Sequence, residues 1–217
     1  MDNYNSKTVG YFGTPRAEML EFVPQNVESI LEIGCGAGAF GALVKQHRNC
    51  KYTGVELTDN ASEKASKLLD RVIVANIENS TLPFQPGAFD CLILNDILEH
   101  LIDPWKILKE LTLYLKPGGY VVISVPNVRF SEVIKDLVFR KKWEYREQGV
   151  LDQTHLRFFT ESSLRELCFS AALEVITLKG INGIQYAWRL QLINIILLGA
   201  LNDMRYMQFG CVCKLAK

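Results

Sequence analysis

The sequence has no surplus of charge of either sign, because 24 Lys and Arg residues are matched by 24 Asp and Glu residues. Proteins that bind nucleic acid through its phosphates usually carry a basic surplus, so this balance argues against such a partner. The charged and hydrophobic shares, 22% and 48%, are close to those of average soluble proteins, which excludes a disordered or collagen-like chain. A length of 217 residues predicts a single domain, 1–217.

Paired cysteine motifs are also missing. None of the six cysteines stands in a CxxC pair or shares a Cys/His spacing of the structural-zinc kind, so we expect reduced, mostly buried thiols. The first twenty residues lack the basic start, the apolar run and the small-residue cleavage site of a secretory signal. A cytoplasmic location is the resulting expectation.

No internal repeat and no low-complexity tract interrupts the chain, and Gly and Pro residues punctuate it only locally. Short apolar runs alternate with helical patterns, and one helix is expected from a cap at Asp103 and Pro104 to about Leu115. This alternation predicts an α/β fold with a doubly wound, mostly parallel sheet covered by helices on both faces. The expected strands are 29–33, 52–56, 71–75, 89–94 and 120–125, and 207–214 fits a closing strand with Cys211 and Cys213 on one face.

Ligands of such sheets bind beyond the carboxyl ends of the strands, and a glycine-rich segment, Gly34-Cys35-Gly36-Ala37-Gly38, follows the first expected strand there. Glycines permit a tight turn and a close approach of a ligand to backbone N–H groups. With Ala39 the segment also satisfies the dinucleotide fingerprint, so a nicotinamide cofactor has to be considered. Glu56 ends the second strand, where one carboxylate could hold both hydroxyls of a ribose.

Four stretches in this order decide between the two nucleoside cofactors: ILEIGCGAG, YTGVEL, VANIENSTLPFQPGAFDCLILNDILEHL and LKPGGYVVISVPN. Over residues 29 to 128 the chain resembles the class I S-adenosylmethionine-dependent methyltransferases. The resemblance implies a Rossmann-like sheet of seven strands, S-adenosyl-L-methionine as cofactor and S-adenosyl-L-homocysteine as product.

The resemblance also assigns roles to individual residues. Glu32 would orient the loop or meet the methionine amino group, Glu56 would bind the ribose hydroxyls, and Leu57 would pack on adenine. Relatives commonly carry Asp where this chain has Asn76, followed by an apolar residue, here Ile77. An amide oxygen still accepts a hydrogen bond from adenine, so binding is expected to be weaker rather than lost. The remaining cofactor residues implied are Gly34, Gly36, Gly38 and, at the methionine end, Asn95.

The acceptor of the methyl group is approached by elimination. The fourth strand is followed by Asn95-Asp96-Ile97-Leu98 rather than by the Asn-Pro-Pro-(Tyr or Phe) motif of amide and exocyclic-amine methylases. The Pro-Cys nucleophile of cytosine C5 methylases does not occur in the sequence. Both absences favour an oxygen acceptor.

Two of the three histidines are candidate catalytic residues. His155 lies in a His-x-Arg-x-Phe-(Thr or Ser) segment that the resembling family places near the acceptor pocket, where a neutral imidazole could act as base or could pin the loop. His100 closes Asp96-Ile97-Leu98-Glu99-His100, which resembles the ubiquinone-pathway O-methyltransferases, where such a segment has a metal-binding role. We expect no metal here and a pocket-wall role for His100. His47 lies in a polar helix end and is expected to be solvated.

Two segments depart from a plain methyltransferase core. Residues 126–158 are expected to form an insertion that shapes the acceptor pocket. Residues 180–203 form an apolar insertion before the last strand, and within it 181–201 are too polar for a spanning helix. Either a helix in a homodimer interface or over the active site, or an interfacial helix that makes the protein peripheral to the inner membrane, accounts for this segment.

The sequence thus predicts a methyltransferase that acts on a hydroxyl of a small molecule or of a saccharide, including a lipid-linked one. The resemblance associates the N-terminal Tyr11…Arg16-Ala17-Glu18-Met19-Leu20 and the His-x-Arg segment with polysaccharide biosynthesis in bacteria. Two rival interpretations remain open: a regulatory protein that binds the cofactor without turnover, with Asn76 as a sign of decay, and a nicotinamide-dependent oxidoreductase.

Overall fold

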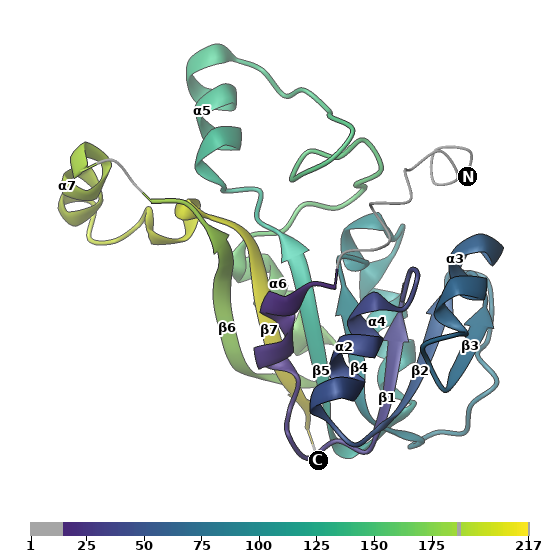
Figure 1. Ribbon diagram of the computed structural model, residues 1–217. Helices are drawn as coiled ribbons and strands as arrows, with labels where there is room; N and C mark the ends of the chain where they lie inside the picture. Colours follow the sequence, from purple (N-terminus) through teal and green to yellow (C-terminus); the bar gives the residue numbers. More distant parts are fainter. Residues whose placement is uncertain (1–14, 186–187, 217) are drawn as a thin grey trace.

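A computed structural model describes residues 15–185 and 188–216 and shows one sheet of seven strands (Figure 1). The strand order is β3-β2-β1-β4-β5-β7-β6, and β7 is the strand that runs antiparallel to its neighbours. The predicted doubly wound, mostly parallel sheet is therefore confirmed. The strands are β1 Ser29–Ile33, β2 Lys51–Glu56, β3 Arg71–Val74, β4 Phe89–Asn95, β5 Leu115–Pro126, β6 Leu173–Gly183 and β7 Tyr206–Leu215.

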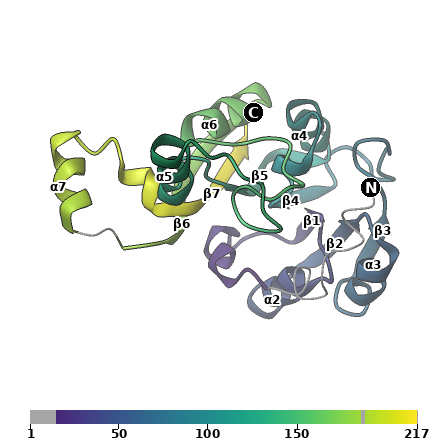
Figure 2. The same ribbon diagram turned by 90° about the horizontal axis from the view of Figure 1, so that it is seen from above.

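Helices cover both faces of the sheet, as the view from above shows (Figure 2). One face carries η2 Ala17–Phe22, α2 Ala39–His47 and α3 Asp59–Ala65, and the other carries α4 Pro104–Thr112 and α6 Glu161–Ser170. Each face has its own apolar cluster, one built on side chains such as Met19 and Val44 and the other on side chains such as Leu108 and Leu164. The remaining elements lie beyond the sheet or follow β4: α5 Ser131–Arg140, α7 Trp188–Ile196, η3 Leu98–His100 and η4 Asn202–Arg205.

The expected strands are confirmed to within a few residues, but one expected helix is shorter than predicted, and the helix expected within 181–201 occupies only part of that segment. The helix predicted to run to about Leu115 ends at Thr112, because the N–H groups of Leu113 and Tyr114 turn back to carbonyls three residues earlier and Leu115 already pairs with Phe89. Asp103 caps this helix through Lys106 N, as predicted. Within 181–201, only α7 is an α-helix in the described part, because β6 pairs with β7 as far as Gly183.

Two further features of the sequence can be placed. All six cysteines are free, five of them buried, and the Sγ atoms of Cys211 and Cys213 lie 3.4 Å apart on one face of β7. Among the described residues, no helix has both the length and the apolar character that crossing a membrane requires. Tyr11 lies outside the described residues, as do Tyr186 and Ala187 of the apolar insertion.

Asp90 joins the amino ends of three central strands. Its Oδ2 accepts hydrogen bonds from Glu28 N, Ser29 N and Ser29 Oγ, and its Oδ1 accepts one from Lys116 Nζ at 2.7 Å. Burial by itself raises the pKa of Asp90, but the hydrogen bonds from Lys116 and Ser29 outweigh it and hold the pKa below its ordinary value. The carboxylate form therefore stabilises the fold.

We predict that Asp90→Asn lowers the free energy of unfolding by about 1.5 to 3 kcal/mol at pH 7, the range for hydrogen bonds to a charged group. A lowered pKa in the folded state gives stability that is present above the ordinary pKa and lost as the pH falls through the folded value. The gap between wild type and variant should therefore close below about pH 4 in urea titrations. Glu63→Gln, on exposed α3 surface, is the control; an equal gap at pH 7 and pH 3 would contradict the prediction.

Candidate cofactor and acceptor site

The glycine loop after β1 depends on backbone conformations that other residues rarely adopt. Gly34, Gly36 and Gly38 all have positive φ angles, 70°, 53° and 81°. A Cβ at Gly34 would lie 2.0 Å from Cδ1 of Ile97, so the loop also needs the empty space at this position. The N–H groups of Gly34 and Cys35 both bond to the carbonyl of Val55, which fixes the loop against the end of β2.

Glu56 holds this loop in place from the carboxyl end of β2. Its buried carboxylate accepts a hydrogen bond from Gly36 N through Oε2 and two more, from Thr58 N and Thr58 Oγ1, through Oε1, each at 3.0 Å. One side chain thus joins the glycine loop to the turn that begins α3. The carboxylate predicted to bind the ribose is thus also the one that holds the glycine loop.

Glu32 lies beneath the loop and is buried. The hydroxyl of Tyr52 donates a hydrogen bond of 3.0 Å to its Oε2. Burial raises the pKa of Glu32 to about 8, the Tyr52 hydrogen bond acts in the opposite direction, and the charge of Glu56 raises the value further. In this state Glu32 is a proton-bearing acid at neutral pH that a neighbouring cation would ionise.

The residues predicted to meet adenine lie around the same edge of the sheet. Leu57 is 42% exposed and Ile77 packs on the core. The Oδ1 atom of Asn76 already accepts a hydrogen bond from Glu78 N at 3.0 Å, closing a turn. An amide oxygen has two lone pairs, so it can accept one further hydrogen bond.

Asn95, at the end of β4, has the least satisfied side chain of the predicted set. Its Oδ1 and Nδ2 atoms are both buried, and neither has a hydrogen-bond partner within the described ranges. Buried polar groups are almost always hydrogen-bonded in folded proteins. An amide left without partners at the carboxyl end of a central strand points to a polar ligand at this position.

Asp96 does not cluster with Glu99 and His100, although a metal site like that of the ubiquinone-pathway O-methyltransferases would require it. It has a positive φ of 51°, and its Oδ1 accepts hydrogen bonds from Ser124 Oγ at 2.8 Å and Gln208 Nε2 at 3.0 Å. Its Oδ2 forms an ion pair with Arg16 at the start of η2. Asp96 therefore serves as the anchor of Arg16.

The same contacts continue into a ring of polar side chains across the carboxyl edge of the sheet. Arg16 Nε donates to Glu18 at 2.7 Å, and Asn182 Nδ2 donates to Gln208 Oε1 at 2.7 Å and to Glu18 at 3.5 Å. Sequence reasoning missed this ring. The one hint in the sequence was the Arg-Ala-Glu motif near the N-terminus. This motif does not identify Asp96 as the partner of Arg16.

His155 is brought together instead with Glu99 and His100. The imidazole rings of His100 and His155 meet edge to face with centroids 4.8 Å apart, and ligand-type atoms of the three residues lie within 4.8 Å of one another. Nδ1 of His155 lies 3.0 Å from the carbonyl oxygen of Val150, and Nδ1 of His100 lies 3.1 Å from that of Thr154. A carbonyl only accepts, so in both rings Nδ1 carries the proton and Nε2 is the basic atom of the neutral form.

Backbone contacts hold the His155 segment against the turn after β4. The N–H groups of Leu156 and Arg157 both donate to the carbonyl of Glu99, at 2.8 and 3.0 Å, and the Arg157 guanidinium donates to the carbonyl of Ile102. The loop is thus pinned largely by groups other than the His155 ring. His47, by contrast, is exposed at the end of α2, as expected.

A cavity of about 120 Å³ opens among these elements. It lies at the carboxyl ends of β4 and β5, and residues of 126–158 supply part of its wall. His155 lines the cavity, whereas His100 packs behind it. The lining residues are Asp96, Glu99, Pro126, Gly149, Val150, Asp152, His155, Met207 and Gln208.

Comparison with known proteins shows which family the chain belongs to. A family described as "Methyltransferase domain" matches residues 10–178. The ubiquinone biosynthesis O-methyltransferase of Idiomarina loihiensis is 28% identical over 162 residues, which cover 71% of this chain and 65% of that protein. The chain therefore spans less than two thirds of the length of this curated relative.

Solved structures share the fold. A SAM-dependent methyltransferase from Archaeoglobus fulgidus has a TM-score of 0.70 at 14% identity, covering 98% of this chain and 97% of that one. A SAM-dependent methyltransferase from Thermotoga maritima, described as a possible histamine N-methyltransferase, has a TM-score of 0.65 at 20% identity, covering 99% and 95%. The family match over more than half of the sequence and the shared fold mean that the chain belongs to the methyltransferase domain family, among the class I S-adenosylmethionine-dependent methyltransferases.

Proposed function

We propose that the protein transfers the methyl group of S-adenosylmethionine to a hydroxyl of a small molecule or saccharide. The observation that carries the proposal is the position of the unpartnered Asn95 amide, between the glycine loop and the cavity lined by His155. A cofactor held by the loop would have its methionine end at Asn95 and its reactive centre toward that cavity. The family match supports the cofactor, and the missing N-methylase motifs support the oxygen acceptor.

The residues in and around the glycine loop suit this cofactor. Glu56 would bind the ribose hydroxyls, Glu32 the methionine ammonium, and Asn95 a polar atom of the methionine portion, while Leu57 and Ile77 would flank adenine. The glycines Gly34, Gly36 and Gly38 leave the space that these portions need. When bound, the cofactor supplies an electrophilic methyl group, which leaves with the attacking oxygen and releases S-adenosylhomocysteine.

On the acceptor side, His155 is the base best supported by the geometry. Its Nδ1–H is held by the Val150 carbonyl, so in the neutral ring Nε2 is the basic atom that would take a hydroxyl proton. His100 packs on His155 and would hold its orientation. We expect this proton transfer to operate without a metal, and elemental analysis of the purified protein tests that expectation.

The proposal as a whole is tested by incubating the protein with methyl-labelled cofactor and candidate acceptors, and then identifying labelled products by mass spectrometry. Nucleotide sugars, lipid-linked glycans and phenolic precursors cover the acceptor classes that the sequence and its relatives suggest. Label on carbon-bound oxygen supports the proposal. Labelled amines as the preferred products would overturn the oxygen acceptor.

Cofactor binding provides a prediction about Glu56. Glu56→Ala should weaken S-adenosylhomocysteine binding by about 1.5 to 3 kcal/mol in calorimetric titrations, because hydrogen bonds to a charged group are lost. The matched control, Glu63→Ala, removes an exposed carboxylate of α3 and should leave binding unchanged. Tight NAD binding by the wild type, without S-adenosylhomocysteine binding, would assign the chain to the oxidoreductases instead.

The raised pKa of Glu32 predicts a pH dependence. Below about pH 8 the free protein holds this carboxyl protonated, and a cofactor ammonium favours the carboxylate, so binding releases a proton. S-adenosylhomocysteine affinity should therefore rise with pH, by up to about tenfold per unit, and level off near pH 8. In Glu32→Gln this part of the dependence should vanish.

Stability gives an independent readout of the same group. A raised pKa in the folded state means stability that is present below the ordinary value of 4.5 and lost as the pH rises through about 8. The ligand-free wild type should therefore lose stability relative to Glu32→Gln over this window in urea titrations. A constant difference between the two proteins from pH 5 to pH 9 would show that Glu32 ionises normally.

The base assignment predicts different effects of two substitutions at His155. His155→Ala should lower kcat by about 10²- to 10⁴-fold with cofactor affinity unchanged, because general-base catalysis supplies a factor of this size. His155→Gln keeps a donor for the Val150 carbonyl but has no basic nitrogen, so it should be nearly as slow. If His155→Gln retained a kcat within a few-fold of wild type, the residue would be a loop anchor rather than a base.

A further inference from the structure

The apolar insertion after β6 forms an arm that projects from the sheet (Figures 1 and 2). In the described ranges this arm comprises residues 184–185 and 188–205; it carries α7 and η4 and lies beyond the end of the sheet at which β5 and β6 finish. Its large apolar side chains face solvent: Ile195 is 70% exposed, Ile196 77% and Leu198 96%. Exposed apolar patches of this kind mark interaction surfaces.

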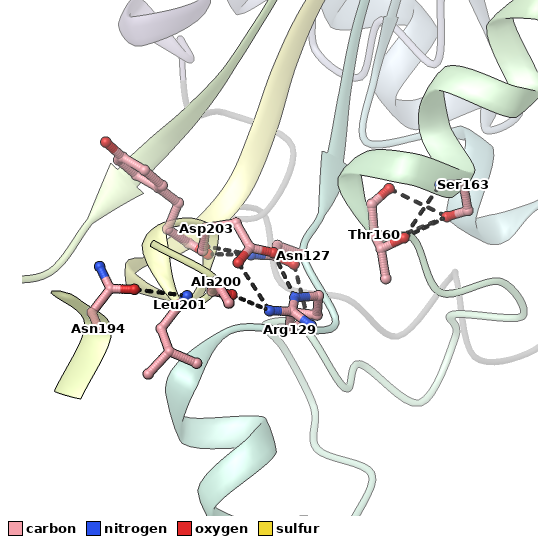
Figure 3. A network of polar contacts seen from close by, with 9 residues as sticks. Asn127, Arg129, Thr160, Ser163, Asn194, Ala200, Leu201 and Asp203 are labelled. Atoms are coloured by element: carbon pink, nitrogen blue, oxygen red, sulfur yellow. Dashed lines mark hydrogen bonds and ion pairs between the residues drawn. The ribbon is translucent and has the colours of Figure 1, made fainter. Parts of the chain in front are cut away.

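Hydrogen bonds within the arm fix the turn after α7. Asn194 accepts a hydrogen bond from Leu201 N through Oδ1 (Figure 3). It also donates one to Asn202 Oδ1, and the two bonds close the turn after α7. At the root, Arg129 holds Asp203 through two hydrogen bonds of 2.6 and 3.2 Å, and Asn127 donates to the carbonyls of Asp203 and Tyr206. The turn thus has apolar side chains on its outside and hydrogen-bonded polar side chains on its inside. This arrangement suits a lipid environment, where polar groups without hydrogen bonds are costly.

A second insertion exposes apolar side chains at the same end of the molecule. α5 lies beyond the carboxyl end of β5, and its last turn exposes Val138 and Phe139. These two protrusions are separate in sequence, and the cavity lined by Pro126, His155 and Met207 lies at the end of the sheet from which both project. A planar surface is the simplest single partner for two protrusions on one end.

The charged residues of the arm indicate which kind of surface it could bind. No acidic residue occurs between Glu174 and Asp203, whereas Lys179 and Arg189 do. From 184 to 202 the arm therefore has no carboxylate that an anionic lipid surface would repel, and Asp203 at its root is paired with Arg129. Trp188, 65% exposed at the start of α7, is a residue type that favours the boundary between water and lipid.

We propose that the arm and α5 dock the protein on an anionic lipid bilayer, with α7 inserted among the headgroups and the cavity facing the membrane. The docking itself does not depend on the methyl transfer reaction. Combined with the proposed function, it implies that the acceptor hydroxyl belongs to an amphiphilic molecule presented at the bilayer surface.

The test is flotation of the full chain with vesicles of phosphatidylethanolamine and phosphatidylglycerol, and with vesicles of phosphatidylcholine alone. We expect the wild type to float with the anionic vesicles and less with the zwitterionic ones. The arm variant Ile196→Asn/Leu198→Asn should reduce the partition coefficient by at least about tenfold, because two large apolar side chains no longer enter the lipid.

The matched control is Leu113→Asn/Phe169→Asn, which removes two exposed apolar side chains at the opposite end of the sheet, before β5 and β6 begin. Control and arm variant should both bind S-adenosylhomocysteine like the wild type, which keeps this test separate from that of the proposed function. Equal flotation of the two variants would overturn the proposal. Light scattering gives the alternative outcome. If the wild type does not float and forms a dimer that only the arm variant loses, the arm binds a second copy of the chain.

Discussion

The ion pair between Arg16 and Asp96 holds together segments that are far apart in the chain. Through Ser124, Gln208 and Asn182 it links η2 to β4, β5, β7 and β6 at the carboxyl edge of the sheet. The site lies on this edge, next to Asn95. A displacement of the pair would therefore shift the cavity lined by Asp96 and Gln208, which we propose takes the acceptor, together with the neighbouring Asn95, which we propose meets the cofactor.

The parts of the fold that could be predicted from sequence are those whose signal is local. Buried parallel strands read as short apolar runs, and the glycine loop is specified by residues 34 to 38, because positive φ angles and close approach need glycine there. The proposed ribose-binding role of Glu56 was inferred from its place at the end of β2. The resemblance to a family supplied the cofactor and the number of strands.

The parts that sequence reasoning missed depend on contacts between distant residues. Asp96 sits among potential ligands in sequence, and only the fold shows that its positive φ turns it toward Arg16 and away from Glu99. The meeting of Glu99 with His155 requires a loop more than fifty residues further on to return to the same turn. In the apolar insertion, the pairing of β6 with β7 overrides a run of residues that favours a helix.

If Glu56 binds the ribose as proposed, cofactor binding replaces hydrogen bonds that this carboxylate already makes within the protein. An ionised carboxylate offers about four acceptor sites, and three are already taken by Gly36 and Thr58. A ribose diol needs two, so one hydrogen bond within the protein has to be shared or released as the sugar enters. Thr58 precedes α3, and Gly36 lies in the loop before α2. A ribose bound at Glu56 would therefore alter hydrogen bonds at the starts of both helices. The binding enthalpy would then be smaller than the count of new hydrogen bonds implies.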